Sequence, residues 1–354
     1  MKAALIGLPQ SGKSTLFTAI TGHVPPPAQA GQEHLASVKV PDPRLDVLAK
    51  MYKREKIVPA TLEFVDFPGF TLTTPQGQGE FRRHVASLRT CDVIVAVIRA
   101  FENPNVPAYR NRVDPAADLS ELRTELGFAD LEVASARIER LRKQIAKPTP
   151  SQEHDKRELA LLERCQEALE ADRPLSGVTQ NDEERQVLRS FAFLTQRPLV
   201  VVMNVNESDV NKPVPINRQD LAHLVVLSAP IEAEIAQLDP EDRPAFLADI
   251  GIAEPALDSL VHACYKAMGL LSFLTIGEHE VRAWSLSAGS TALEAAGKVH
   301  TDMARGFIRA ETVAYDDLIA AGDMKTAKAA GKVRLEGKSY IVKDGDVILF
   351  RFNV

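Results

Sequence analysis

A glycine-rich segment near the start of the chain limits the possible fold more than any other feature. It fits the pattern GxxxxGK[ST] and reads Gly7-Leu8-Pro9-Gln10-Ser11-Gly12-Lys13-Ser14-Thr15. An apolar run, Ala3–Ile6, precedes it, and a run with helical character, Thr15–Thr21, follows it. In such a loop the backbone N–H groups converge on phosphate oxygens at a helix N-terminus. The segment therefore predicts a phosphate-binding loop between a strand and a helix.

Each side chain of this loop has an expected task. Lys13 would reach the β- and γ-phosphates of a nucleotide, and the Ser14 hydroxyl would ligate Mg²⁺. The residues expected to contact the nucleotide here are Gly7, Pro9, Gln10, Ser11, Gly12, Lys13, Ser14 and Thr15. A chance match is the alternative, but the flanking strand and helix both lie on the required sides.

Apolar runs elsewhere indicate the fold class. Five runs rich in Val, Ile and Leu do not alternate with polar residues: Ala3–Ile6, Thr61–Val65, Val93–Ile98, Leu199–Met203 and Leu224–Leu227. That pattern is typical of strands buried on both faces of a parallel sheet. Helical segments separate them, so we expect an α/β doubly wound domain.

Two parts of the chain depart from this pattern. Between Asp118 and Asp172, leucines recur at helical spacing on both sides of the break Lys147–Ser151, which predicts an antiparallel helical hairpin inserted into the α/β domain. Simple packing explains that hairpin as well as a binding role does. The last part is β-rich, with expected strands at 281–286, 340–342 and 347–350 and a helix at 292–304.

The expected domains follow from these changes in pattern. They are residues 1–115 (nucleotide-binding domain, first part), 116–195 (helical coiled-coil insertion), 196–275 (nucleotide-binding domain, second part) and 276–354 (small C-terminal domain).

Three more motifs follow other expected strands. Asp66-Phe67-Pro68-Gly69 fits DxxG, in which Asp66 would hold magnesium through water and the Gly69 amide would face the γ-phosphate. Asn204-Val205-Asn206-Glu207 and Ser228-Ala229 stand where base contacts are expected, with Asn204, Val205, Glu207, Ser228 and Ala229 as the candidate residues. Parallel sheets bind ligands at the carboxyl ends of their strands, so the joint occurrence of the motifs predicts one purine-nucleotide site.

The fourth position of the base motif indicates the base. GTP-specific proteins carry Asp there, and its carboxylate accepts hydrogen bonds from guanine. Glu207 is one methylene longer than Asp, which displaces that acceptor. The loss of a buried polar match can cost several kcal/mol of binding free energy. The sequence therefore favours ATP over GTP.

Composition excludes several classes. The formal net charge of -6 argues against coating of nucleic acid by bulk electrostatics, so no DNA partner is expected, while a local RNA contact stays open. Cys91, Cys165 and Cys264 lack paired spacing and are expected to be buried thiols. No apolar run approaches the ~20 residues that span a bilayer, and residues 1–7 lack a signal-peptide pattern. We expect a cytoplasmic protein without a membrane partner.

Beyond these motifs, the chain resembles the YchF/Obg-like ATPases over essentially its whole length. The stretches that carry the resemblance are residues 7–15, 41–46, 204–207, 297–302, 306–311 and 336–354. The resemblance implies a G domain of the TRAFAC class, a C-terminal TGS domain of β-grasp type, ATP preference, and association with ribosomes. It implies nucleotide contacts at Gly12, Lys13, Ser14, Thr15, Asn204 and Glu207.

Departures from the family pattern concern hydrolysis. Gln10-Ser11 replaces Asn-Val, which puts potassium dependence in doubt, and the interval 22–41 lacks the family's magnesium-binding Thr, for which Ser37 is a possible replacement. Many GTPases have a water-orienting Gln at position 70, where this chain has Phe70; a hydrophobic residue there is itself a family trait. Ala108 stands where the family recruits a His. We therefore assign no catalytic residue. His84 is a weak candidate, since a His beside two arginines is more often only solvated.

These observations leave three functions to distinguish. The first is a slow NTPase that associates with the ribosome through the helical insertion and the TGS domain. The second is a hydrolysis-deficient nucleotide-sensing scaffold, and the third is a metabolic P-loop kinase, which the base motif disfavours. A basic run in the C-terminal domain would contact RNA phosphates or simply be solvated: Lys325, Lys328, Lys332, Arg334 and Lys338.

Overall fold

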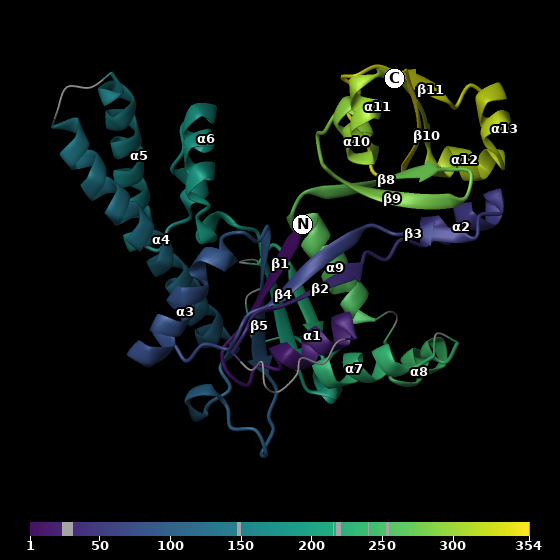
Figure 1. The fold of residues 1–354 in the computed structure, drawn as a ribbon. Coiled ribbons are helices and arrows are strands. Elements are labelled where there is room, and N and C mark those ends of the chain that lie inside the picture. The colour runs from purple at the N-terminus through teal and green to yellow at the C-terminus, as the bar shows by residue number, and fades with distance from the viewer. Residues whose placement is uncertain are drawn as a thin grey trace. The chain divides into compact units, whose positions relative to one another are not determined.

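The apolar runs of the N-terminal two-thirds form one sheet, as predicted (Figure 1). Its strand order is β2-β4-β1-β5-β6-β7, and the pairs from β4 to β7 are parallel. All five predicted strands are present: β1 (Lys2–Ile6), β4 (Thr61–Asp66), β5 (Val93–Ala100), β6 (Leu199–Val205) and β7 (Leu224–Leu227). The edge strand β2 (His34–Lys39) was not predicted, because its residues alternate between half-buried and exposed.

This computed structural model describes residues 1–22, 31–146, 150–214, 216, 221–239, 241–252 and 255–353. The chain divides into two units, each with its own sheet. The first unit comprises Met1–Ala36 and Glu63–Leu257, and the second comprises Ser37–Leu62 and Asp258–Val354.

Helices follow the strands of the first unit, and some of them have a side-chain cap. Helix α1 (Lys13–Thr21) starts in the phosphate-binding loop and ends at Gly22, which has a positive φ. Helix α3 (Pro75–Leu88) is capped by the Thr74 hydroxyl, which accepts a hydrogen bond from the Gly77 amide. Two shorter helices, α7 (Ala229–Gln237) and α8 (Arg243–Asp249), follow β7. These helices place the loops at the carboxyl ends of the strands.

The helical insertion is an antiparallel pair with a third helix beside it (Figure 1). Its helices are α4 (Pro115–Ile145), α5 (Gln152–Glu170) and α6 (Asp182–Phe191), which share an apolar core. The predicted hairpin is therefore confirmed, although Lys147–Thr149 of its expected break lie outside the described residues. At the base of the hairpin, the buried Asp130 carboxylate accepts hydrogen bonds from the Leu194 and Thr195 amides and pairs with Arg89.

The second unit is β-rich, as predicted, with the strand order β11-β10-β12-β8-β9-β3. Its strands are β3 (Lys56–Val58), β8 (Leu270–Ile276), β9 (Glu280–Ser287), β10 (Phe307–Ala314), β11 (Arg334–Glu336) and β12 (Asp346–Phe352). Its helices are α2 (Pro43–Tyr52), α9 (Ala256–Ala267), α10 (Ala292–Val299), α11 (Thr301–Arg305), α12 (Tyr315–Ala321) and α13 (Met324–Ala329). The expected strand at 340–342 was wrong: Ile341 makes only an isolated bridge to Thr291.

Residues 37–62, which the sequence analysis assigned to the first nucleotide-binding segment, belong to the second unit. Two contacts explain this assignment. Strand β3 adds to the second sheet through parallel pairing with β9, and Arg44 Nη1 donates to the Asp344 carboxylate at 2.8 Å. Both contacts join residues more than 200 positions apart, so no local sequence pattern announces them.

Candidate functional site

The phosphate-binding loop connects β1 to α1 in a conformation that needs its glycines. Gly12 has a φ of 86°, and a Cβ atom there would lie 2.1 Å from Asn204 Nδ2. A Cβ atom on Gly7 would lie 2.7 Å from the carbonyl oxygen of Val97. Gln10 also has a positive φ, 62°, which is unusual for a residue with a side chain. The loop therefore has a strained, tightly enclosed backbone of the kind that presents its amides to an anion.

Asn204 holds this loop to the loop after β7. Its side chain is 2% exposed and lies at the end of β6. Asn204 Nδ2 donates to the carbonyl oxygen of Ser11, and the Ala229 amide donates to Asn204 Oδ1, both at 2.9 Å. One buried amide thus joins three of the four sequence motifs.

The fourth motif reaches the loop through a charge pair. Asp66, at the end of β4, pairs with the Lys13 ammonium, and both side chains are buried. Burial lowers the pKa of Lys13, while the neighbouring Asp66 carboxylate opposes that shift. Gly69 lies close to the same loop, since a Cβ atom there would be 3.4 Å from Pro9 Cα.

The donor set at this point fits magnesium. Ser14 is exposed in the first turn of α1, and Asp66 offers a carboxylate at the carboxyl end of the adjacent strand. Hydroxyl and carboxylate oxygens are the ligands that Mg²⁺ prefers. Ser37, the possible replacement for the family's switch threonine, is an exposed residue of β2.

A cavity of about 640 Å³ opens beside the phosphate-binding loop. It is lined by backbone and side chains of the loop, of the segment after β5 and of both base motifs, among them Gly12, Thr15, Phe101, Val205, Glu207 and Ala229. Glu207 is exposed, in a short 3₁₀ segment that follows Asn206, and the buried Ser228 also lines the cavity. The size and the mixed lining suit a purine ring with its sugar.

Arg99 is a residue of this site that the sequence analysis missed. Among the described residues, its buried guanidinium donates to four carbonyl oxygens: those of Phe101, Val106 and Pro107 after β5, and that of Gln10 in the phosphate-binding loop. The guanidinium also stacks over the Phe101 ring, 4.3 Å from its centroid. Burial lowers its pKa. In the sequence, the sign of its role was that Arg99 directly follows the apolar run Val93–Ile98.

The positions expected to govern hydrolysis carry no titratable group in contact with the loop. Phe70 is 1% exposed and packs edge-on against Phe81, with ring centroids 5.1 Å apart. Ala108 caps a short 3₁₀ turn and offers only a methyl group. The expectation that His84 is only solvated was wrong. It is half-buried, and its Nδ1 lies 2.6 Å from Glu33 Oε1.

The three described cysteines are not candidate nucleophiles. All are buried, as predicted. Burial raises the thiol pKa to about 11 for Cys91 and Cys165 and to about 12 for Cys264, so the reactive thiolate is scarce at neutral pH.

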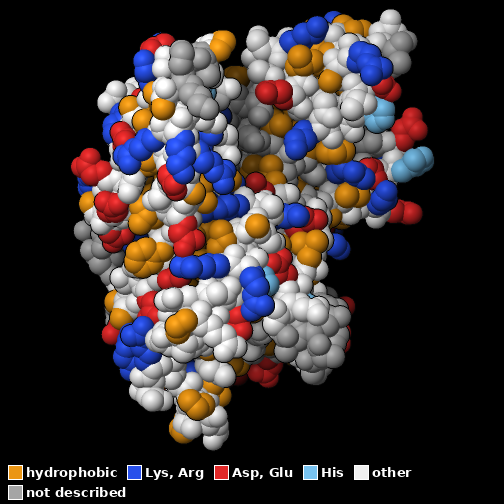
Figure 2. Space-filling model, turned by 60° about the vertical axis from the view of Figure 1, so that its left-hand side comes forward, with side chains coloured by type: hydrophobic (Ala, Val, Ile, Leu, Met, Phe, Trp, Pro, Cys, Tyr) orange, Lys and Arg blue, Asp and Glu red, His pale blue; other side chains and the backbone are white. Residues whose placement is uncertain are grey.

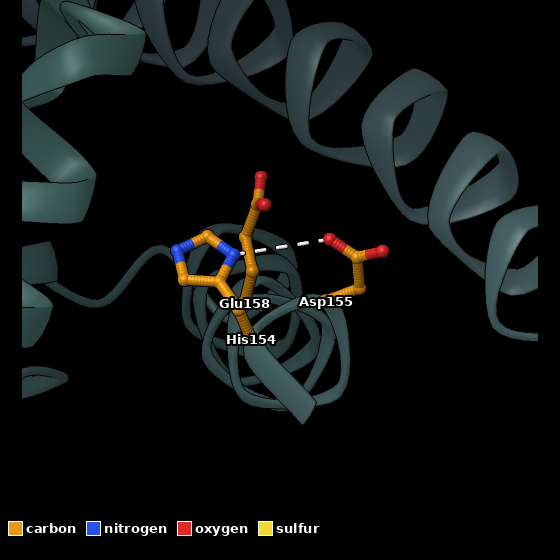
Figure 3. A group of neighbouring side chains, drawn as sticks. All are labelled: His154, Asp155 and Glu158. Atoms are coloured by element: carbon orange, nitrogen blue, oxygen red, sulfur yellow. Dashed lines mark ion pairs between the residues drawn. The ribbon is translucent and has the colours of Figure 1, made fainter. Parts of the chain in front are cut away.

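A second possible metal position lies on α5, where His154, Asp155 and Glu158 come together (Figure 3). The carboxylate of Glu158 is already used, because Arg137 donates to both of its oxygens at 2.7 and 2.8 Å. His154 is largely exposed, and its Nδ1 lies 3.8 Å from an Asp155 oxygen. The group is thus explained by an ion pair that joins α4 to α5.

Charges of both signs are interspersed over the face of the molecule in Figure 2. In the basic run of the second unit, Lys332 pairs with Asp317 and Arg334 pairs with Asp346 and Glu336. Lys325, Lys328 and Lys338 are exposed, and no ion pair within 4 Å is found for them among the described residues. Of the five basic residues in this run, three therefore have no ion pair among the described residues.

Among the residues described, no helix has the length and apolar character needed to cross a membrane.

Two family profiles match the sequence: "50S ribosome-binding GTPase" over residues 2–127 and "Protein of unknown function (DUF933)", the YchF-GTPase C-terminal family, over residues 270–353.

Individual relatives match over the full chain. A protein of Bacillus subtilis named "Ribosome-binding ATPase YchF" is 41% identical, with all of both chains covered, and "Obg-like ATPase 1" of Caenorhabditis elegans is 34% identical, with 100% of this chain and 92% of that protein covered. The solved structure of the Schizosaccharomyces pombe YchF GTPase superposes with a TM-score of 0.83 at 27% identity, covering 99% of this chain and 97% of the other. Full-length identity at this level leaves one assignment: the chain belongs to the YchF/Obg-like family of P-loop NTPases.

Proposed function

We propose that this protein is a regulatory P-loop NTPase that binds a purine nucleotide, prefers ATP, hydrolyses it slowly and associates with the ribosome. The observation that carries the proposal is the bridge made by Asn204 between the phosphate-binding loop and the Ala229 turn, beside a cavity of about 640 Å³. A nucleotide bound there would have its phosphates on the loop and its base in the cavity.

The residues proposed to hold the nucleotide fall into two groups. The phosphates would meet Gly7, Pro9, Gln10, Ser11, Gly12, Lys13, Ser14, Thr15 and the amide of Gly69. The base and sugar would meet Asn204, Val205, Glu207, Ser228 and Ala229, with Phe101 as an additional aromatic neighbour. Binding would also separate Lys13 from Asp66, because the phosphates compete for the ammonium.

Magnesium is the proposed cofactor. Ser14 and Asp66 would hold it, the latter through water, and the ion would neutralise charge on the phosphates. The replacement of Asn-Val by Gln10-Ser11 keeps potassium activation in doubt. Calorimetry of ATP binding with and without Mg²⁺, in sodium and in potassium buffers, separates the two ions.

ATP preference is proposed from Glu207. The longer side chain moves its carboxylate away from the place where Asp accepts from guanine, and curated relatives carry "ATPase" in their names. The variant Glu207→Asp should shift the ratio of ATP to GTP affinity toward GTP by about tenfold, as measured by calorimetry with each nucleotide. An unchanged ratio would place base selection elsewhere in the cavity.

Slow hydrolysis is proposed because Phe70 and Ala108 supply neither a proton acceptor nor a water-orienting dipole. The same observation favours the second candidate, a nucleotide-sensing scaffold without hydrolysis. Single-turnover measurements with and without ribosomes separate them: a measurable rate that rises with ribosomes supports the NTPase. Unaided turnover faster than about one per second would refute slow hydrolysis.

The ribosome is proposed as partner because relatives are named "Ribosome-binding ATPase". The helical insertion and the C-terminal domain are the proposed surfaces, with Lys325, Lys328 and Lys338 as candidate contacts to ribosomal RNA phosphates. Such a protein would act in the cytoplasm. Co-sedimentation with ribosomes in ATP-analogue and ADP states, at two salt concentrations, tests both the association and its electrostatic share.

A further inference from the structure

Two hydrogen bonds to one carboxylate join segments that lie on either side of the Asp66–Gly69 turn in the sequence. Glu33, just before β2, receives both: His84 Nδ1 lies 2.6 Å from Glu33 Oε1, and the Ser87 hydroxyl donates to Oε2 at 2.6 Å. We assign the Nδ1 proton to His84, since a carboxylate only accepts. Hydrogen bonds to a charged acceptor are about twice as strong as neutral ones.

The neighbours of His84 do not share this contact. Arg82 pairs with Glu132, and Arg83 lies near Glu80, so both arginines are directed elsewhere. The Glu33 carboxylate is thus held by a histidine and a serine one helical turn apart on α3. We call Glu33, His84 and Ser87 the clasp.

The clasp reaches the DxxG turn through aromatic contacts. The His84 ring lies 5.7 Å from the Phe70 ring and 6.1 Å from the Phe67 ring, centroid to centroid. Phe67 and Phe70 are buried and flank Gly69, whose amide is expected to face the γ-phosphate. A shift of His84 would therefore change its contacts with Phe67 and Phe70, which lie before and after Gly69 in the turn.

The start of α3 is tied to the same turn by its backbone. Gly77 approaches Thr71 so closely that a Cβ atom would lie 2.1 Å from the Thr71 carbonyl oxygen, and Gln78 Nε2 donates to the Leu72 carbonyl oxygen at 3.0 Å. The turn after Gly69 is therefore packed against the start of helix α3, and Glu33 joins this helix to the segment leading into β2.

We propose that Glu33 and His84 act as positioning residues: the closed clasp holds the Gly69 turn in the place that favours a triphosphate over a diphosphate. This inference rests on the proposed nucleotide binding and adds to it which residues set the discrimination. A γ-phosphate can favour the position of the Gly69 turn seen here only if it binds that position more tightly than other positions. By thermodynamic reciprocity, the hydrogen bonds of the clasp, which favour the same position, then raise the affinity for the triphosphate.

The test measures affinity for a non-hydrolysable ATP analogue and for ADP in full-length variants. Glu33→Ala removes both hydrogen bonds, and His84→Phe keeps the ring contacts but removes the donor. Each should lower affinity for the ATP analogue about tenfold and change ADP affinity by less than about twofold. The double variant should lose no more than Glu33→Ala alone, because that change already breaks the hydrogen bond to His84.

Two further variants separate the hydrogen bond from packing or misfolding. His84→Asn restores a side-chain N–H near the position of Nδ1 without the ring. Because α3 also contacts the turn through Gly77 and Gln78, this variant should recover part of the discrimination. His154→Phe makes the same substitution at a largely exposed histidine of α5 and should change neither affinity. Melting temperatures of all variants show that each is folded.

Three results would refute the proposed role of the clasp. In the single variants, the affinities for the ATP analogue and for ADP could fall together, or neither could change. In the double variant, the losses of the two single variants could add. The proposed role would also be overturned if His84→Asn behaved like His84→Phe. Wild-type protein that binds neither nucleotide would instead remove the proposed function itself. That result is recognised before any variant is compared.

Discussion

The two halves of the nucleotide site are built very differently. In the binding half, polar groups are buried and joined to one another: Asn204 bridges Ser11 and Ala229, and Lys13 pairs with Asp66. In the half where water would attack, Phe70 is packed into the apolar core and Ala108 carries only a methyl group. Under the proposed function, nucleotide affinity and hydrolysis rate would therefore depend on separate residues.

The strongest challenge to the binding half is Gly12→Ala. Its Cβ atom would meet Asn204 Nδ2 at 2.1 Å, and the φ of 86° disfavours any side chain. We expect a loss of nucleotide affinity of more than about 100-fold by calorimetry. Gly22→Ala is the matched control, because Gly22 also has a positive φ but nothing lies within 4 Å of its Cβ position. Similar affinities for both variants would contradict the enclosed geometry of the loop.

Asn204→Ala tests the bridge itself. It leaves the Ser11 carbonyl and the Ala229 amide without their partner, at a cost of about 1–3 kcal/mol for each buried group. Nucleotide affinity should fall at least tenfold, roughly, and the free energy of unfolding in urea should fall as well. Asn204→Asp keeps the acceptor for Ala229 and should fall between wild type and Ala. Equal behaviour of Asp and wild type would show that the Ser11 contact is idle.

Arg99→Met tests how the cavity wall is held. The change keeps the aliphatic stem but removes the donors to the carbonyl oxygens of Phe101, Val106 and Pro107. We expect a loss of nucleotide affinity of about three- to tenfold and faster amide exchange in residues 101–107, followed by hydrogen-exchange mass spectrometry. Arg123→Met, at an exposed position of α4, is the control. Unchanged exchange in the segment would remove Arg99 from the site.

Phe70→Gln tests the other half. Placing an amide in the apolar contact with Phe81 should lower the free energy of unfolding by about 2–4 kcal/mol. Affinity for ADP should change least among these variants, and hydrolysis should rise by less than about tenfold, because the side chain is directed into the core. A rise of about a thousandfold in single-turnover rate would show that position 70 alone limits catalysis.

Patterns that depend on neighbours in sequence predicted most of the fold. The five buried strands were found because both of their faces are covered, which makes the runs continuously apolar. Strand β2 was missed because an edge strand has one exposed face and its residues alternate. Residues 37–62 were assigned to the first unit because their contacts with β9 and Asp344 lie far along the chain.

The same limit applies to the site. Lys13, Asp66, Asn204 and Ala229 were found because each belongs to a short motif at the end of a strand. Arg99 belongs to no such motif, and only the structure reveals that its donors serve two loops. Glu33 and His84 are 51 residues apart, and a histidine that follows two arginines gives no hint of a carboxylate partner.

We propose that the amides around Lys13 and the bridge at Asn204 form a nucleotide site, while Phe70 and Ala108 leave it poorly equipped for hydrolysis. Calorimetric titration of wild-type protein with ATP, in the presence and absence of Mg²⁺, is the decisive measurement. We expect magnesium-dependent binding of ATP that Gly12→Ala abolishes. Folded protein with no magnesium-dependent affinity for ATP or GTP at millimolar concentrations would contradict it.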